Sequence, residues 1–298
     1  MKPLHNYQLI TACAGAFLLH ALTAQSQNLF VVEDGGTILN ITSNGTQSAF
    51  ATVSAASNIP LAFNSMGDLF VPDESSHNIY KFTPSGAEST FASVSLSPIL
   101  GMAFNSTGDL FVAADYDILE FAPDGAQSSF ASLVYPSSGM AFNTAGDLFV
   151  ASTQHDIKEI TPAGVQSVFA SGLSPVGLAF NSAGDLFEAD YSSGNIYEFT
   201  PGGVKSTFTS GLDVPVGLAF NAAGDLFVSD EASGNIYEYA PDGTRSTFAS
   251  GLNQPSGLAF QSTPEPSSLW LVLLGSGILF ALRIATKRSP THDEFFSA

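Results

Sequence analysis

The chain has 298 residues, which allows one or two domains, and it carries 27 acidic residues against 8 basic ones, for a formal net charge of −19. This balance argues against functions that need clustered Lys and Arg, namely binding to nucleic acid or to anionic lipid. Cys13 is the single cysteine, so the chain cannot form a disulfide framework.

Residues 1–27 have the features of an export signal. Lys2 is the basic start, Leu9–Leu22 is an apolar stretch, and Ala24-Gln25-Ser26 supplies small residues around a cleavage point. Two alternatives are a disordered or membrane-anchoring N-terminus and a lipoprotein signal with Ile10–Cys13 as its motif. The apolar stretch mostly follows Cys13 instead of preceding it, which favours export over lipidation.

From residue 28 to residue 263 the chain repeats one pattern of short apolar runs separated by turn-forming residues. The Gly-Asp pair that opens the second run recurs at steps of 41, 38, 38 and 40 residues. The pairs begin at Gly67, Gly108, Gly146, Gly184 and Gly224. A period near 40 built from short strands predicts a β-propeller in which each repeat is one four-stranded blade.

The copy between residues 215 and 250 shows how each blade is expected to form. Gly217–Phe220 is the first strand, and Asn221–Asp225 is a turn in which Gly supplies the positive φ. Leu226–Val228 and Ile236–Tyr239 are the second and third strands, and Ser246–Ser250 is a more polar outermost strand. The inner strands are more apolar than strict alternation would give, as expected where both faces of a sheet are covered.

The ends of the repeat region predict how the ring closes. Six second strands begin near Leu29, Leu69, Leu110, Leu148, Leu186 and Leu226, and six first strands end at Phe63, Phe104, Phe142, Phe180, Phe220 and Phe260. These numbers match only if the last strand, Ser256–Phe260, completes the blade that begins at Leu29. The predicted fold is therefore an all-β, six-bladed propeller closed by its N- and C-terminal strands, with no central sheet edge exposed.

Acidic residues at the ends of the second strands are the candidate metal ligands. The series is Glu33, Asp73, Asp190 and Asp230, with Asp34 and Asp115 one residue later. On a closed ring such carboxylates approach one mouth, and Ca²⁺ takes six to eight oxygen ligands. In the alternative reading each carboxylate caps the turn that it opens. Ser152 and Ala114 interrupt the series, which favours the turn role.

Other candidates are weaker. His77 and His155 occupy the wide turns of different blades and are not spaced as a metal pair. Glu188 stands where most copies have Val, and it is expected either to face the central channel or to lie at an exposed edge. The tyrosines of the third strands are expected to pack. The sequence contains no Ser-His-Asp set, phosphate loop or zinc spacing.

Residues 263–288 break the repeat. An apolar run, Leu269–Leu282, is followed by Arg283, Lys287 and Arg288. If Arg283 reaches to the interface, the run extends to about 17 residues, the short end of a transmembrane helix, with its basic end in the cytoplasm. A core helix is the alternative.

This segment resembles a PEP-CTERM sorting signal. Its Pro-Glu-Pro motif, hydrophobic helix and basic end are matched by Pro264-Glu265-Pro266, Leu269–Leu282 and the cluster from Arg283 to Arg288. The resemblance implies a Gram-negative bacterial protein that is anchored in the inner membrane as a precursor and sorted by an exosortase to the cell surface or extracellular matrix. The tail, residues 289–298, departs from the pattern. The predicted parts are residues 1–27 (signal), 28–263 (propeller), 264–288 (sorting signal) and 289–298 (tail).

The repeat resembles NHL and SMP-30/gluconolactonase-type propellers. The shared motifs are Pro-x-Gly-Leu-Ala-Phe, Gly-Asp-Leu-Phe-Val-x-Asp and Gly-Asn-Ile-Tyr-Glu-Phe. Where NHL repeats usually carry Arg before the third strand, this chain has Asn78, Asn195 and Asn235. Virginiamycin-lyase-like propellers are also similar, but their functional His has no evident counterpart here.

Two functions from different classes follow. The first is a non-enzymatic surface or matrix module whose propeller mouth binds a glycan, a peptide or a partner protein. The second is a metal-dependent hydrolase or lactonase similar to the SMP-30 group, for which calcium would be the cofactor. A shared fold does not decide between them.

Overall fold

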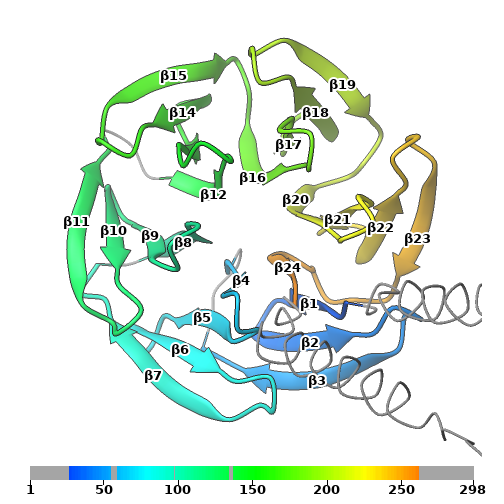
Figure 1. Ribbon diagram of the computed structural model, residues 1–298. Coiled ribbons are helices and arrows are strands. Elements are labelled where there is room, and N and C mark those ends of the chain that lie inside the picture. The colour runs from blue at the N-terminus through cyan, green and yellow to red at the C-terminus, as the bar shows by residue number, and fades with distance from the viewer. Residues whose placement is uncertain (1–26, 55–58, 97, 134–136, 262–298) are drawn as a thin grey trace, which may run out of the picture. The chain divides into compact units, whose positions relative to one another are not determined.

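The computed structural model describes residues 27–54, 59–96, 98–133 and 137–261, all within the compact unit Met1–Thr263. These residues form 24 strands in six four-stranded antiparallel sheets, arranged as blades around a central axis (Figure 1). The predicted six-bladed propeller is confirmed. The predicted signal and transmembrane helices, and the sorting motif, fall on residues outside the described ones. In the described part of the chain, no helix meets the length and apolarity that a membrane span requires.

The blades take their strands in chain order, except at the closure. Blade 1 contains β24 (Leu258–Phe260), β1 (Leu29–Val32), β2 (Thr37–Ile41) and β3 (Gln47–Thr52). Blade 2 contains β4 (Ala62–Phe63), β5 (Leu69–Asp73), β6 (Asn78–Phe82) and β7 (Glu88–Ser93). Blade 3 contains β8 (Ile99–Phe104), β9 (Leu110–Ala114), β10 (Asp117–Phe121) and β11 (Gln127–Ser132).

The second half of the ring follows the same plan. Blade 4 contains β12 (Ser137–Phe142), β13 (Leu148–Ser152), β14 (Asp156–Ile160) and β15 (Gln166–Ser171). Blade 5 contains β16 (Pro175–Phe180), β17 (Leu186–Asp190), β18 (Asn195–Phe199) and β19 (Lys205–Thr209). Blade 6 contains β20 (Pro215–Phe220), β21 (Leu226–Asp230), β22 (Asn235–Tyr239) and β23 (Arg245–Ala249).

The ring closes where the sequence predicts it. Strand β24 pairs with β1 in antiparallel register, with Leu29 opposite Phe260 and Val31 opposite Leu258. Beyond the last pair, the Gln261 N–H donates to the Asn28 carbonyl at 3.0 Å. The final strand thus supplies the innermost position of blade 1, and no blade has an unpaired strand at the axis.

The strand boundaries differ from the predicted ones by one or two residues. In blade 6 the first strand begins at Pro215 and the second continues to Asp230, because Pro215 pairs with Asp230 across a bulge. We predicted the strand limits from the apolar runs. The backbone pairing extends beyond those runs, to residues such as Asp230 whose side chains are polar. Strand β4 is the shortest first strand, with two residues. Pro60 precedes it, and proline has no N–H to donate to a ladder.

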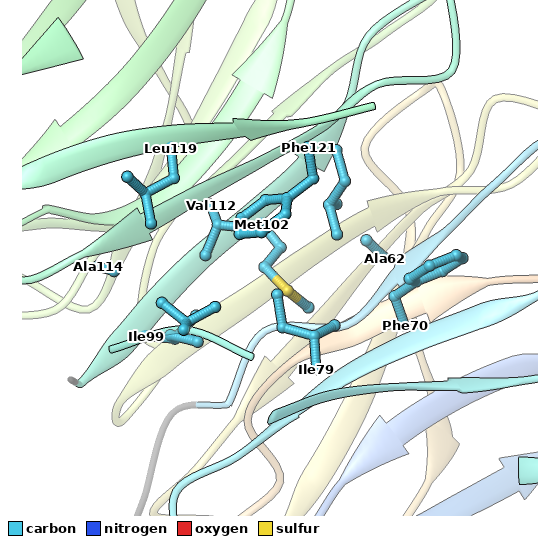
Figure 2. Packing of buried hydrophobic residues seen from close by; sticks show 11 residues of the cluster. Ala62, Phe70, Ile79, Ile99, Met102, Val112, Ala114, Leu119 and Phe121 are labelled. Atoms are coloured by element: carbon cyan, nitrogen blue, oxygen red, sulfur yellow. The ribbon is translucent and has the colours of Figure 1, made fainter. Parts of the chain in front are cut away.

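The hydrophobic core lies between neighbouring blades. Figure 2 shows one such layer, in which Ile99, Met102 and Phe121 of blade 3 pack against Phe70 and Ile79 of blade 2. Every residue of each second strand is buried, in all six blades. Both faces of a blade are therefore covered, which explains why the inner strands are continuously apolar.

A phenylalanine in each second strand links two blades. Phe187 packs edge-on against Phe208 of its own blade and against Phe220 of the next blade, with ring centroids 5.1 Å apart in both pairs. The equivalent residues Phe30, Phe70, Phe111, Phe149 and Phe227 each make the same two contacts. Edge-to-face pairs add about 0.5–1.5 kcal/mol beyond area burial, so this contact stabilises every blade-to-blade joint.

Candidate binding site

One face of the propeller carries the connections from blade to blade together with the turns between second and third strands; we call it the crossover face. Successive strands are antiparallel, so the end of each second strand lies beside the start of its first strand. Backbone bonds join the two sets of loops: Tyr191 N–H donates to Ser174 O at 2.9 Å, and Glu231 N–H donates to Val214 O at 2.8 Å.

A cavity of about 360 Å³ lies at the axis and is bounded by the innermost strands. Its lining is mostly apolar and includes Ile59, Leu100, Val176 and Val216, with Ser138 as a polar exception. These residues stand at or just before the starts of the first strands, which places the cavity towards the crossover face. It has the character of a small-ligand or side-chain pocket, apolar with few polar groups.

Glycines line the axial cavity where the innermost strands of neighbouring blades come close together. A Cβ atom on Gly177 would lie 2.1 Å from the carbonyl oxygen of Val216, and one on Gly217 would lie 2.3 Å from that of Ser256. Both distances are far shorter than van der Waals contact. In five of the six blades a glycine is therefore needed at this position, because the innermost strand approaches the backbone of the next blade; in blade 2 the position is Pro60.

Six equivalent positions surround the mouth of the cavity. Thr153, the first residue after β13, lines the cavity itself. The corresponding first residues after four other second strands are Glu74, Asp115, Tyr191 and Glu231, and in blade 1 the equivalent is Asp34, two residues after β1. Each of these five donates its N–H to a crossover carbonyl. We call these six residues the mouth positions. Four of them are acidic, so the mouth is strongly anionic.

The acids one residue earlier are held in turns. Asp190 accepts N–H groups from Ser174 at 2.7 Å and Ser193 at 2.9 Å, one to each carboxylate oxygen. Burial alone would raise the pKa of Asp190, but these hydrogen bonds to its charged form hold the pKa below its ordinary value. Asp73 shows the same pattern with Ser54 and Ser76, and the same direction of pKa shift.

The other two members of this series have similar partners. Asp230 accepts N–H groups from Asp213 and Val214, and Glu33 accepts one from Asn253 at 2.8 Å. Across the described ranges, no three His, Cys, Asp or Glu side chains come together as metal ligands. These contacts favour the turn role for Glu33, Asp73, Asp190 and Asp230, while calcium binding by them stays a prediction.

The Gly-Asp acids stabilise turns on the opposite face. In blade 6, Asn221 Oδ1 accepts the Asp225 N–H at 2.9 Å, and Asn221 Nδ2 donates back to the Asp225 carboxylate at 2.8 Å. The same reciprocal pair occurs at Asp68, Asp109, Asp147 and Asp185. The Asn-x-x-Gly-Asp motif is thus explained by the turn that it builds.

Glu188 lies at neither of its expected places. Its side chain is 0% exposed, and it does not line the axial cavity. It pairs across strands with Leu178 and shares a face with Leu186, and both leucines pack against Phe149 and Ala151 of blade 4. Glu188 is therefore buried between blades 4 and 5, and both expected placements are wrong.

The buried Glu188 carboxyl is electrostatically unfavourable. Neither carboxyl oxygen has a hydrogen-bond partner among the described residues. Burial, and secondarily the charge of Asp190, raise its pKa to about 8, although Lys205 opposes the shift. At neutral pH the group is mostly protonated and uncharged.

The histidines and tyrosines make structural contacts. His77 and His155 adopt positive φ, and His155 Nδ1 lies 2.9 Å from the Leu173 carbonyl oxygen. Tyr197 and Tyr237 lie under the cations of Lys205 and Arg245 respectively. Tyr80 packs against the core between blades 1 and 2, and Tyr239 is buried between blades 5 and 6.

No protein-family model matches this chain, and no curated protein sequence matches it. Solved structures do. A chain in the crystal structure of the nidogen/laminin complex is similar with a TM-score of 0.71 and 17% identity, covering 80% of this chain and 99% of that one. Virginiamycin B lyase from Staphylococcus aureus is similar with a TM-score of 0.59 and 15% identity, covering 80% and 92%.

A protein of unknown function from Bacteroides caccae is similar with a TM-score of 0.63 and 15% identity, covering 80% of this chain and all of that one. What these chains share is the fold. At such identities the likeness does not extend to activity, and the neighbours include both a protein from a binding complex and a lyase.

Proposed function

We propose that this chain is an exported binding module that takes its ligand at the axial mouth of the crossover face. The observation that carries the proposal is the apolar cavity of about 360 Å³ at the axis, with Thr153 of the mouth positions in its lining. The acids that a hydrolase would use as metal ligands make turn hydrogen bonds, which supports the binding module over the hydrolase. The nidogen/laminin likeness supports a propeller in a binding complex, as an analogy of fold.

The location proposed for this module comes from the chain ends. The signal-like residues 1–27 support export, and the Pro264-Glu265-Pro266 motif with its apolar run and basic end supports sorting by an exosortase. We propose that the protein is held in the inner membrane as a precursor and then reaches the cell surface or extracellular matrix. The strong negative charge is compatible with solubility there.

The test is binding of the purified full-length chain to arrays of glycans and peptides. A Val176→Phe variant, which fills the axial cavity, should lose the signal, because Val176 lines that cavity. Val204→Phe is the matched control, because Val204 is 68% exposed on a loop before an outermost strand. Calcium-dependent turnover of a lactone by the wild-type chain would contradict the proposal and support the SMP-30-like hydrolase instead.

A further inference from the structure

We infer that the ligand of this mouth is a basic peptide segment with an aliphatic side chain between its cationic residues. The inference rests on the proposed function and names the ligand class for the same site. Two features support it together: the apolar lining of the axial cavity and the distribution of charge around its mouth. Neither feature alone would specify a ligand.

The four acidic mouth positions belong to consecutive blades, from Glu231 of blade 6 through Asp34 and Glu74 to Asp115 of blade 3, and the outer two stand on opposite sides of the axis. Asp34 follows the second strand of blade 1 and Glu231 that of blade 6, and these blades are neighbours in the ring. Asp115 follows the second strand of blade 3, which lies across the axis from blade 6 (Figure 1). A ligand complementary to this pattern carries positive charge on both sides of an apolar group.

The basic residues of the described chain are not at the mouth. The four are Lys81, Lys158, Lys205 and Arg245. They belong to third and fourth strands, where Lys158 pairs with Asp156 at 2.8 Å and Lys205 and Arg245 lie over tyrosine rings. The described loops of the crossover face contain no Lys or Arg.

The two neighbouring acids already influence each other. Partial burial, and then the negative charge of Asp34, raise the pKa of Glu231. A cation placed between the two carboxylates would relieve this repulsion. Exposed aromatic rings at Tyr116 and Tyr191, each 49% exposed, stand on the same face and offer further contact to Lys or Arg side chains.

The cavity determines the apolar part of the ligand. Its lining by Leu100, Val176 and Val216 offers no charged partner, so burying an aliphatic side chain there is favourable and burying a charge is not. A peptide presents both requirements in one chain, with an aliphatic residue at the axis and Lys or Arg on either side, towards the acids of opposite blades.

The test uses three probe peptides of sequence Lys-Lys-Leu-Lys-Lys, Lys-Lys-Ser-Lys-Lys and Glu-Glu-Leu-Glu-Glu, titrated into the full-length chain by calorimetry. We expect the first to bind about tenfold more tightly than the second, because only it buries a Leu side chain. The third should not bind. The triple variant Asp34→Asn/Asp115→Asn/Glu231→Gln should weaken the first peptide about tenfold.

The matched control is Glu88→Gln/Glu120→Gln/Glu238→Gln. It changes the net charge equally, but on third and fourth strands away from the mouth. Equal weakening by both triple variants, or equal binding of the Leu and Ser peptides, would overturn the inference in favour of unspecific charge attraction. Calcium binding that only the mouth variant abolishes would assign the acids to a metal and would also overturn it. Array binding to glycans that depends on Val176, without peptide binding, would leave the proposed function standing and refute the peptide.

Discussion

Blades 5 and 6 have nearly the same sequence and the same pairing, yet they bury very different groups. Strand β17 reads Leu-Phe-Glu-Ala-Asp and β21 reads Leu-Phe-Val-Ser-Asp, and both pair with their third strands in identical register. The two strands differ at two positions. Blade 5 buries the carboxyl of Glu188 where blade 6 has Val228, and it has Ala189 where blade 6 has Ser229.

The comparison shows that the repeat tolerates a buried acid without changing its register. Flanking residues of the motif occupy the same places in both blades, and the Phe pairs at Phe187 and Phe227 have the same geometry. The register of a strand is fixed by its whole apolar pattern, so one deviant residue cannot shift it. The unfavourable burial of the Glu188 carboxyl instead makes the free energy of unfolding depend on pH.

The largest expected effect comes from a feature that the two blades share. Gly177→Val should prevent a stable ring, with a loss of more than about 4 kcal/mol, because its Cβ would lie 2.1 Å from the Val216 carbonyl oxygen. Gly217→Val should be equally damaging. The control is Gly202→Ala, where the nearest atom to a new Cβ is 3.9 Å away. Urea unfolding followed by circular dichroism measures all three, and a stable Gly177→Val protein would disprove the close approach.

The second-largest expected effect comes from the main difference between the blades, Glu188 in blade 5 against Val228 in blade 6. The Glu188 carboxyl has a folded pKa of about 8, above its ordinary value of 4.5, so the folded state holds a proton that the unfolded state releases. The stability that depends on this proton is fully present below pH 4.5. It is lost as the pH rises towards and through 8, where the buried carboxyl must ionise. Glu188→Val, which makes blade 5 resemble blade 6, should therefore raise the free energy of unfolding at pH 9 by about 4–5 kcal/mol.

The measurement is urea unfolding at several pH values between 4 and 9. Glu188→Gln separates charge from packing, because it should flatten the same pH dependence without filling the site with a hydrocarbon. The reciprocal variant, Val228→Glu, should introduce a similar dependence in blade 6. If wild type and Glu188→Gln followed the same pH curve, the buried carboxyl would not be the source.

The smallest expected effect tests the second difference between the blades. The Ser229 hydroxyl accepts the Gly217 N–H and donates to the Ser256 carbonyl oxygen, both at 2.7 Å. It therefore ties blade 6 to the segment leading into the closing strand. Ser229→Ala should reduce the free energy of unfolding by about 1–2 kcal/mol, because it removes a buried acceptor.

The reciprocal change, Ala189→Ser in blade 5, is the control and should give no matching gain. Thermal unfolding of both variants would check the pair. A loss below experimental error for Ser229→Ala would show that the buried serine adds nothing to closure.

The fold could be predicted because the same pattern of strands and turns recurs in all six blades. Each second strand begins at its predicted leucine, and the unpaired final strand indicated the closure. Strand ends were predicted less well. The backbones of Asp190 and Asp230 still belong to the strand ladders, although their side chains accept hydrogen bonds from loops. The shortness of the first strand in blade 2 could have been predicted from Pro60, which stands where the other blades have glycine.

The candidate site was predictable in residue type but not in role. Sequence placed acids at the ends of the second strands, but it could not show which oxygens accept N–H groups from a neighbouring loop. The mouth positions lie one residue later, where Asp34 and Asp115 had been noted. Their relation to the cavity depends on the ring geometry seen at Thr153. For Glu188 a signal existed: alternation places it on the face of Leu186, which packs on blade 4.

The pairing of β24 with β1 also determines how the ring would yield under mechanical load. Asn28 and Gln261 stand at the same end of this antiparallel pair, so tension between the two chain ends acts across the strands and not along them. The Gln261–Asn28 bond would break first, then each following bond in turn, as in a zipper. Strands loaded lengthwise share the load over all their bonds, whereas this seam does not. The wheel is therefore expected to open at blade 1 under forces that leave the other five blades intact.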